Sequence, residues 1–413
     1  MRWAFVAVLA ATLVAAGMVG ISSAYHSGGA AECTGCHTMH GSNTYLLQGS
    51  DPSSTCLNCH QHTGDTGPTS YHSSTAPADM PAGVPPKQRA PGGDFGWLKK
   101  TYTFTLRGTP TTDDGNLFGH NIVAADYGYV VDPNNATAPG GTFPSAQLGC
   151  TSCHDPHGQY RRNANGTISK TGAPIANSGS YATSAEPTAT SAVGVYRLLA
   201  GAGYTKGGVT FLGNPAAKVP SSYNRTEAAT QTRVAYGHAT TGGHVSWADW
   251  CKTCHSNHGA FPHPNDQQLG STIATNYNSY VKTGDMTGTA ATSFTSLVPF
   301  VENTSDYTVL ASHAKNDNTY LQGPSGGDRI TCLSCHRAHA SGWNHALRWN
   351  IEYEFMVSGT SWYGTDTTPG DTNANKHRGR TSTETAAAYY DRPATQFAEG
   401  GQRLLCNKCH AKD

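Results

Sequence analysis

The stretch Cys33-Thr34-Gly35-Cys36-His37 is one of six copies of the pentapeptide Cys-x-x-Cys-His in this chain of 413 residues. The other copies span residues 56–60, 150–154, 251–255, 332–336 and 406–410. Two thiols three positions apart can each form a thioether bond to one edge of a porphyrin, and the adjoining histidine can then ligate its iron. The repeated pentapeptide therefore predicts six covalently bound haem c groups.

The cysteine count favours haem attachment over the other uses of Cys-x-x-Cys. Zinc sites and thiol redox motifs share the spacing, but neither explains why a histidine follows the second cysteine in every copy. All 12 cysteines belong to the six copies, so none remains for a separate disulfide. The predicted thioether positions are Cys33, Cys36, Cys56, Cys59, Cys150, Cys153, Cys251, Cys254, Cys332, Cys335, Cys406 and Cys409. The predicted proximal iron ligands are His37, His60, His154, His255, His336 and His410.

The amino terminus indicates export. Arg2 precedes an apolar run over residues 3–19, and small residues follow it up to Ala24, which is the pattern of a secretory signal peptide. An uncleaved membrane anchor is the alternative, but the run is short for a spanning helix. We predict a signal peptide over residues 1–24 and a single hexahaem unit over 25–413. The mature chain is expected to leave the cell through the periplasm and to have no transmembrane segment.

The composition predicts the fold class. Hydrophobic residues make up only 37% of the chain and charged residues 13%, and glycine is abundant. Such a chain is poorly equipped for an ordinary core, and its polar stretches would be disordered alone. Six porphyrins supply the missing apolar surface. We therefore predict a multihaem cytochrome c, mostly coil and turns with short helices and few short strands, whose core is built around six stacked haems.

The motif spacing and the residues between the motifs predict the local elements. Consecutive copies begin 23, 94, 101, 81 and 74 residues apart, so the first two haems are expected to form a close pair. Each motif is expected on a helical turn. Further short helices are expected at residues 226–236, 346–355 and 383–390, and short strands at 101–106 and 127–131.

The charges balance, with 27 basic and 27 acidic residues and a formal net charge of zero. This balance argues against nucleic acid or an anionic membrane surface as a partner. A weakly charged surface permits self-association instead.

The histidine supply predicts the second axial ligand of each iron. The chain has 20 histidines, and those outside the pentapeptides outnumber the six irons. Methionine could compete, but after the predicted signal peptide only Met39, Met80, Met286 and Met356 remain. We therefore predict bis-histidine ligation at every haem. Because such iron has no open position, we predict an electron-transfer protein, not an enzyme, with no catalytic residues.

Four motifs continue to a histidine three residues beyond the proximal one, at His40, His157, His258 and His339. A three-residue tether is too short to reach the opposite face of the same porphyrin, so each is expected to ligate a neighbouring haem. The other main distal candidates are His26, His72, His120 and His313, and the weaker ones are His62, His238, His244, His263, His345 and His377. For each, the alternative is an ordinary hydrogen-bonded or exposed histidine.

Several stretches of the chain together resemble one family. They are residues 26–29, 33–40, 58–65, 90–97, 150–162, 223–227, 306–310, 332–341 and 406–413. In these stretches the chain is similar to the filament-forming hexahaem outer-surface c-type cytochromes of metal-reducing bacteria, the cytochrome nanowire family. The resemblance covers nearly all of the mature chain.

The resemblance implies subunits that polymerise into extracellular filaments, each with six bis-histidine haems in an unbroken column. The column would take electrons from upstream cytochromes and pass them to external acceptors such as iron(III) oxides. It also implies that His40 ligates a haem of the adjoining subunit. The residue-level argument agrees, because His40 cannot serve its own haem and head-to-tail contacts generate open filaments. The chain departs from the family pattern between His238 and Trp250 and around 258–263, so the distal ligand near the fourth haem stays open.

Two other functions are alternatives. A multihaem reductase would need one five-coordinate haem, commonly marked by an altered attachment motif, whereas all six copies here end in histidine. A soluble periplasmic electron shuttle would share the ligation but never polymerise. A high-spin haem band would identify the reductase, and size-exclusion chromatography with electron microscopy would separate the shuttle from the filament.

Because porphyrins replace a side-chain core, the protein without haem is expected not to fold, as zinc fingers do not fold without metal. Replacing all 12 cysteines by alanine is therefore expected to abolish the cooperative thermal transition measured by circular dichroism. A native-like cooperative melt of that variant would contradict the expectation.

Overall fold

The computed structural model describes residues 33–41, 45–62, 71–220, 227–257, 265–369, 373–397, 403 and 405–411. The predicted signal peptide at 1–24 and the distal candidates His26, His258 and His263 lie outside the described residues. They remain predictions from the sequence.

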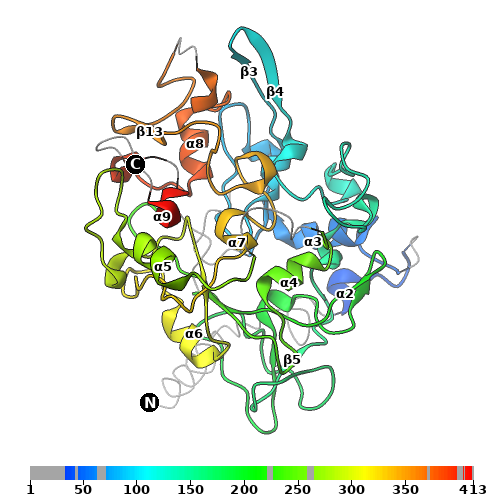
Figure 1. The fold of residues 1–413 in the computed structure, drawn as a ribbon. Helices are drawn as coiled ribbons and strands as arrows, with labels where there is room; N and C mark the ends of the chain where they lie inside the picture. The colour runs from blue at the N-terminus through cyan, green and yellow to red at the C-terminus, as the bar shows by residue number, and fades with distance from the viewer. Residues whose placement is uncertain are drawn as a thin grey trace, which may run out of the picture.

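Most of the described residues lie in loops and turns, and the helices and strands are short (Figure 1). The α-helices are α2 Cys33–Cys36, α3 Pro52–His60, α4 Trp247–Lys252, α5 Gly270–Ser279, α6 Tyr307–His313, α7 Cys332–Cys335, α8 Ser382–Ala388 and α9 Asn407–His410. The 3-10 helices are η1 Pro77–Asp79, η2 Phe95–Lys99, η3 Gly115–Leu117, η4 Ala125–Tyr127, η5 Ser145–Gln147, η6 Cys150–Ser152, η7 Tyr196–Leu198, η9 Ala290–Thr292, η10 Asn344–Ala346, η11 Ala374–Lys376 and η12 Ala394–Phe397. The strands are β1 Gln61–His62, β2 Ser74–Thr75, β3 Tyr102–Leu106, β4 Thr109–Asp113, β5 Arg161–Arg162, β6 Ile168–Ser169, β7 Val193–Gly194, β8 Thr205–Lys206, β9 Val209–Thr210, β10 Ala216–Lys218, β11 Ala235–Gly237, β12 Val301–Glu302, β13 Val357–Ser358 and β14 Ser361–Trp362.

The strands form small, separate sheets. β10, β11 and β12 make a three-stranded sheet in that order, in which β10 is antiparallel to β11 and β11 is parallel to β12. β3 and β4 form a hairpin that pairs Tyr102 with Asp113 and projects at the top of Figure 1. The turn residues Arg107 and Gly108 have φ angles of +49° and +83°, which suit a two-residue hairpin turn.

Two of the five expected elements are confirmed. α8 overlaps the helix expected at 383–390, and β3 falls within the strand expected at 101–106. The Thr381 side chain accepts from the Glu384 N–H, and a Glu384 carboxylate oxygen accepts from the Thr381 N–H, so a capping box starts α8.

The helices expected at 226–236 and 346–355 and the strand expected at 127–131 are wrong. The first segment ends in β11, the middle strand of its sheet, where pairing on both sides overrides helix propensity. At the start of the second, Ala346 has a φ of +54°, which no α-helix accepts. In the third, Gly128 has a φ of +64° and ends η4.

Every attachment motif meets a helical turn, as expected: α2, α3, η6, α4, α7 and α9 carry the six in chain order. Polar side chains start several of these turns. Asp51 caps α3, and its carboxylate accepts from the Ser54 N–H at 2.8 Å. Inside the third and fifth motifs, Ser152 and Ser334 turn their hydroxyls back to accept the N–H that precedes the first cysteine, at 3.0 and 3.2 Å.

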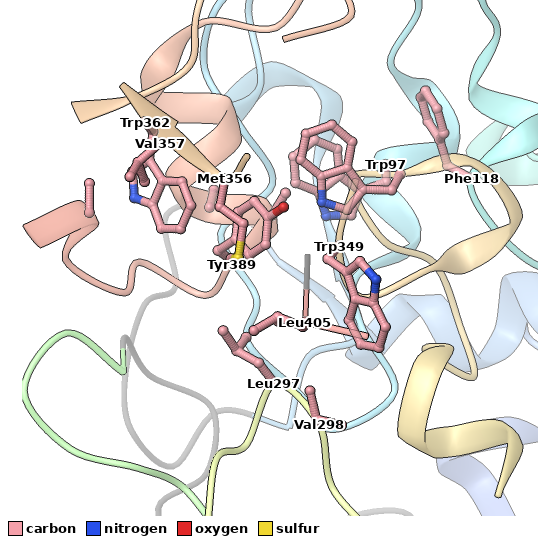
Figure 2. Packing of buried hydrophobic residues seen from close by; sticks show 14 of the residues in the cluster. Trp97, Phe118, Leu297, Val298, Trp349, Met356, Val357, Trp362, Tyr389 and Leu405 are labelled. Carbon is pink, nitrogen blue, oxygen red and sulfur yellow. The ribbon is translucent and has the colours of Figure 1, made fainter. Parts of the chain in front are cut away.

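The largest apolar cluster is rich in aromatic side chains (Figure 2). Trp362 lies flat on Tyr389, with ring centroids 4.4 Å apart and an interplanar angle of 5°. Three attachment cysteines, Cys335, Cys406 and Cys409, pack against this cluster. The fifth and sixth motifs are therefore built into the main side-chain core.

Charged side chains are also buried next to aromatic rings. Arg380 is fully buried, donates to the Gly342 carbonyl at 2.7 Å and lies 4.3 Å from the centre of the Tyr102 ring. Asp113, 2% exposed, binds Arg378 at 2.6 Å and Arg380 at 3.5 Å. Burial alone would raise the pKa of Asp113, but the hydrogen bond and charge of Arg378 and the charge of Arg380 hold it below its usual value.

Removing the negative charge of Asp113 is expected to destabilise the folded protein. Asp113→Asn leaves buried Arg380 without its counter-ion and should lower the free energy of unfolding by about 3–5 kcal/mol, measured by denaturant unfolding of the haem-loaded protein. In the wild type this contribution is present above about pH 4 and is lost as the pH falls through the depressed pKa of Asp113. The matched control is Glu352→Gln, because Glu352 approaches the same Arg378 at 3.9 Å but is 48% exposed. Its expected cost is below about 0.5 kcal/mol, and equal costs for the two variants would contradict the buried-charge argument.

Candidate haem sites and the path between them

The proximal histidines of five motifs make the same type of hydrogen bond to the backbone. In five motifs the Nδ1–H of the histidine donates to a backbone carbonyl 2.8 Å away. The pairs are His37 with Tyr45, His60 with Tyr71, His154 with Arg197, His255 with Pro139 and His336 with His345. Because a carbonyl can only accept, Nδ1 holds the proton and the lone pair is on Nε2, where a metal would bind.

The first, third and fifth motifs also share a local backbone arrangement. Each proximal histidine forms an antiparallel bridge with a leucine two residues after its carbonyl partner. The pairs are His37 with Leu47, His154 with Leu199 and His336 with Leu347. The residue after each leucine donates its N–H to the carbonyl of the motif's second cysteine, at 2.8 Å in all three cases. The sequence does not predict this repeat, because its only signal is a single leucine at a variable distance from the motif.

Three proximal histidines each face a predicted distal histidine. The ring centroids are 6.4 Å apart for His37 and His157, 6.4 Å for His154 and His339, and 6.0 Å for His255 and His120. A metal between two imidazoles, with bonds of about 2 Å to each Nε2, separates the ring centroids by roughly 6 Å. Spacing and tautomer both fit a six-coordinate haem iron at these three positions.

Loop backbone orients two of the distal histidines. His120 donates from Nδ1 to the Ala338 carbonyl at 2.7 Å, and His339 donates from Nδ1 to the Gly93 carbonyl at 3.3 Å. His339 also stacks on Phe95, with ring centroids 4.5 Å apart. Burial lowers the pKa of His120 to about 4 and that of His339 to about 3. Both rings are therefore neutral at physiological pH, as ligation requires.

A glycine pair makes room for His339. A Cβ added at Gly92 would lie 2.9 Å from His339 Nδ1, and one at Gly93 would lie 1.8 Å from the Ala340 carbonyl oxygen. Gly93 also has a φ of +95°, which L side chains rarely adopt.

The other described candidates have different surroundings. His72 stacks on His62 with ring centroids 4.7 Å apart, which is too close for an iron between them. His313 donates from Nδ1 to Glu302 at 2.5 Å and lies flat on Tyr320. His40 is exposed beside α2.

The weaker candidates make ordinary protein contacts. His238 approaches Asp266 at 3.1 Å, and His244 donates from Nδ1 to the Asn214 carbonyl at 3.3 Å. His345 supplies the carbonyl that His336 binds, and His377 accepts from the Gly379 N–H at 3.0 Å. The rings of His244 and His377 are therefore hydrogen-bonded, His238 lies within ion-pair distance of a carboxylate, and His345 contributes its backbone.

Cysteines of successive motifs are neighbours. The side chain of Cys56 lies next to that of Cys150, from the second and third motifs, and the side chain of Cys251 lies next to that of Cys332, from the fourth and fifth. These two contacts join motifs that are 94 and 81 residues apart in the sequence.

The remaining links follow the same order. Cys36 of the first motif lies near Cys59 of the second. Cys153 of the third motif lies near Cys254 of the fourth, and Cys335 of the fifth lies near Cys406 of the sixth. The six attachment motifs thus adjoin one another in chain order. In Figure 1 they run across the molecule from α2 on one side, through α3, α4 and α7, to α9 on the other.

Residues 26–65 match the family described as the doubled CXXCH motif. Over 422 aligned residues, which cover 94% of each protein, the chain is 54% identical to the C-type cytochrome OmcS of Geobacter sulfurreducens. The chain belongs to the OmcS family of c-type cytochromes. Two solved OmcS structures from that organism, one of the nanowires and one of the Outer Membrane Cytochrome S filament, match with a TM-score of 0.85 at 53% identity. Each match covers 94% of this chain and 100% of the OmcS chain.

Membership of the OmcS family confirms the multihaem cytochrome c fold and the six haem c cofactors predicted from the pentapeptides. Within the ranges that the structure describes, no helix combines the length and apolar character needed to cross a bilayer.

Proposed function

We propose that this chain conducts electrons outside the cell through six bis-histidine haems, and that it polymerises into filaments which pass electrons to acceptors such as iron(III) oxides. The observation that carries the proposal is the near full-length similarity to OmcS, whose solved structures are nanowires and filaments. The protein is an electron-transfer protein in this proposal, secreted to the cell outer surface and supplied by upstream cytochromes.

We assign the axial ligands of three haems from the three histidine pairs. His157 closes the first haem opposite His37, His339 closes the third opposite His154, and His120 closes the fourth opposite His255. His157 and His339 themselves follow the third and fifth motifs, so each ties two haem sites together. Their geometry supports this assignment, because each pair has the spacing of two imidazoles on one metal.

The protein residues hold the iron in one coordination state. Attached haem exchanges one electron between iron(III) and iron(II). The carbonyl bonds to Nδ1 prevent each imidazole from rotating, and two imidazoles leave no position for water or substrate. Both features favour electron transfer over catalysis.

The ends of the path support head-to-tail assembly. α2 and α9 lie on opposite sides of the molecule in Figure 1, so the first and last motifs can face different neighbours. Beside α2, Met39 is 83% and Tyr45 71% exposed, and exposed His40 adjoins them. We assign His40 as the ligand of a haem in the next subunit, and His26, His72 and His313 stay distal candidates within the subunit.

Loss of one distal histidine should change one haem. His339→Ala should retain six haems by mass spectrometry but convert about one sixth of the iron from low-spin to high-spin in electron paramagnetic resonance, because the third haem loses its sixth ligand. His339→Met should remain low-spin with a raised potential at that haem. His238→Ala is the control and should match the wild type. A fully low-spin His339→Ala protein would remove His339 from the ligand set.

Assembly should depend on His40. His40→Ala should keep six haems and the subunit fold but form no long filaments, because the iron of the neighbouring subunit loses a ligand. Electron microscopy and size-exclusion chromatography of secreted protein measure this, again with His238→Ala as the control. Long filaments of His40→Ala would place the intersubunit bond elsewhere, and a monomeric wild type would favour the soluble shuttle.

A further inference from the structure

Lys408 is a buried lysine inside the sixth attachment motif, between Cys406 and Cys409. It is 8% exposed. Its Nζ donates to the Tyr280 carbonyl at 2.8 Å and lies 4.7 Å from the centre of the Tyr277 ring. Both tyrosines come from α5 or the residue that follows it, so the α5 segment covers the ammonium group.

The described contacts of Lys408 include no counter-ion. Its described partners are a neutral carbonyl and an aromatic ring, and no carboxylate of the described residues lies within ion-pair distance of Nζ. A carbonyl and a ring solvate an ammonium group without cancelling its charge. Burial lowers the pKa of Lys408 to about 8, so at pH 7 most of the protein carries this positive charge in its interior.

Covalent attachment determines where this charge lies relative to the haem. Cys406 and Cys409 bind the porphyrin edge that carries the former vinyl groups, whereas the two propionates extend from the opposite edge. Lys408, between the two cysteines, is therefore at the attached edge and away from the propionates of its own haem. These propionates cannot form its counter-ion.

Buried charge of this sign favours the reduced haem. Reduction adds one negative charge to the haem, and an interior cation at a distance on the order of 10 Å stabilises it through an effective dielectric constant of about 20. The corresponding change in the reduction equilibrium is roughly tenfold, which is about 59 mV for one electron.

The fourth motif provides a comparison within the same chain. Lys252 occupies the position after Cys251, but its side chain is 32% exposed and its Nζ lies 3.6 Å from the Asp249 carboxylate. Solvent and the carboxylate screen that charge. The two lysines inside attachment motifs therefore differ, because the charge of Lys252 is exposed and paired whereas that of Lys408 is buried beside neutral groups.

We propose that the ammonium group of Lys408 raises the reduction potential of the sixth haem and so favours the electron on the carboxy-terminal motif of the subunit. The step is a one-electron transfer from the iron(II) of a neighbouring haem to the iron(III) of the sixth, and no proton moves. Lys408 acts here as a positioning residue for charge and touches no substrate. The inference requires the attached haem but not the filament, so its failure would leave the assembly proposal unaffected.

Spectroelectrochemical titration of the haem-loaded full-length protein at pH 7 tests the inference. In Lys408→Met, about one sixth of the absorbance change should move to a potential lower by about 59 mV, a tenfold loss in the reduction equilibrium. Lys408→Arg keeps the charge and should overlay the wild type. Lys252→Met is the matched control and should also overlay it. Lys408→Gln should reproduce the Lys408→Met shift and serves as the neutral variant if the methionine variant loses haem.

Three outcomes would overturn the inference. They are an unshifted titration of both neutral Lys408 variants, an equal shift in Lys252→Met, and an equal shift in Lys408→Arg, which would assign the effect to packing. The expected shift should persist in 0.5 M salt, because a buried charge is screened little by ions. Its disappearance in salt would also contradict a buried origin.

Discussion

The hydrogen bond from an imidazole Nδ1 to a backbone carbonyl is the constraint on which the haem sites depend. It leaves Nε2 as the only nitrogen available to iron and prevents the ring from rotating. The partner carbonyl is 8 residues away for His37 but 116 residues away for His255. Meeting this one requirement therefore brings distant loops to the motifs. Because this chain has little regular secondary structure, these hydrogen bonds position loops that sheets and helices would position in other proteins.

Few apolar side chains are available to form a core, because hydrophobic residues are only 37% of the sequence. Aromatic rings provide much of it, and buried arginines fill the space between them. Arg337 lies 3.5 Å from the centre of the Tyr390 ring, and Arg233 lies 4.4 Å from that of Phe294. Planar guanidinium groups stack on such rings with less desolvation cost than an ammonium group. Lys100 and Lys218 are buried ammonium groups as well, but each lies 3.5 Å from a glutamate carboxylate, whereas no described carboxylate pairs with Lys408. This difference underlies the effect that we propose for Lys408 on the haem attached beside it.

Chain order and the spatial order of the attachment motifs coincide in this molecule. Neighbouring attachment cysteines connect each motif to the next, and the resulting series runs from α2 to α9. The distal histidines cross this series, because His157 and His339 follow one motif and face another. In the proposed ligation, the first, third and fifth motifs therefore share these two histidines and are linked through them. The same sharing, extended across a subunit boundary through His40, would make polymerisation and electrical continuity one event.

What the sequence by itself determined is the chemistry that is complete within a few residues: six attachment motifs, their helical turns, the haem c cofactors and the loop-rich fold class. Local signals also located α8 and β3. They failed at β11, at Ala346 and at Gly128, where sheet pairing or a positive φ overrides propensity. Only the tertiary structure decided which distal histidine faces which motif, since His154 meets His339 and His120 binds the carbonyl of Ala338, 218 residues away. Such pairings depend on loop paths through space, and the residues on either side of a histidine carry no information about them.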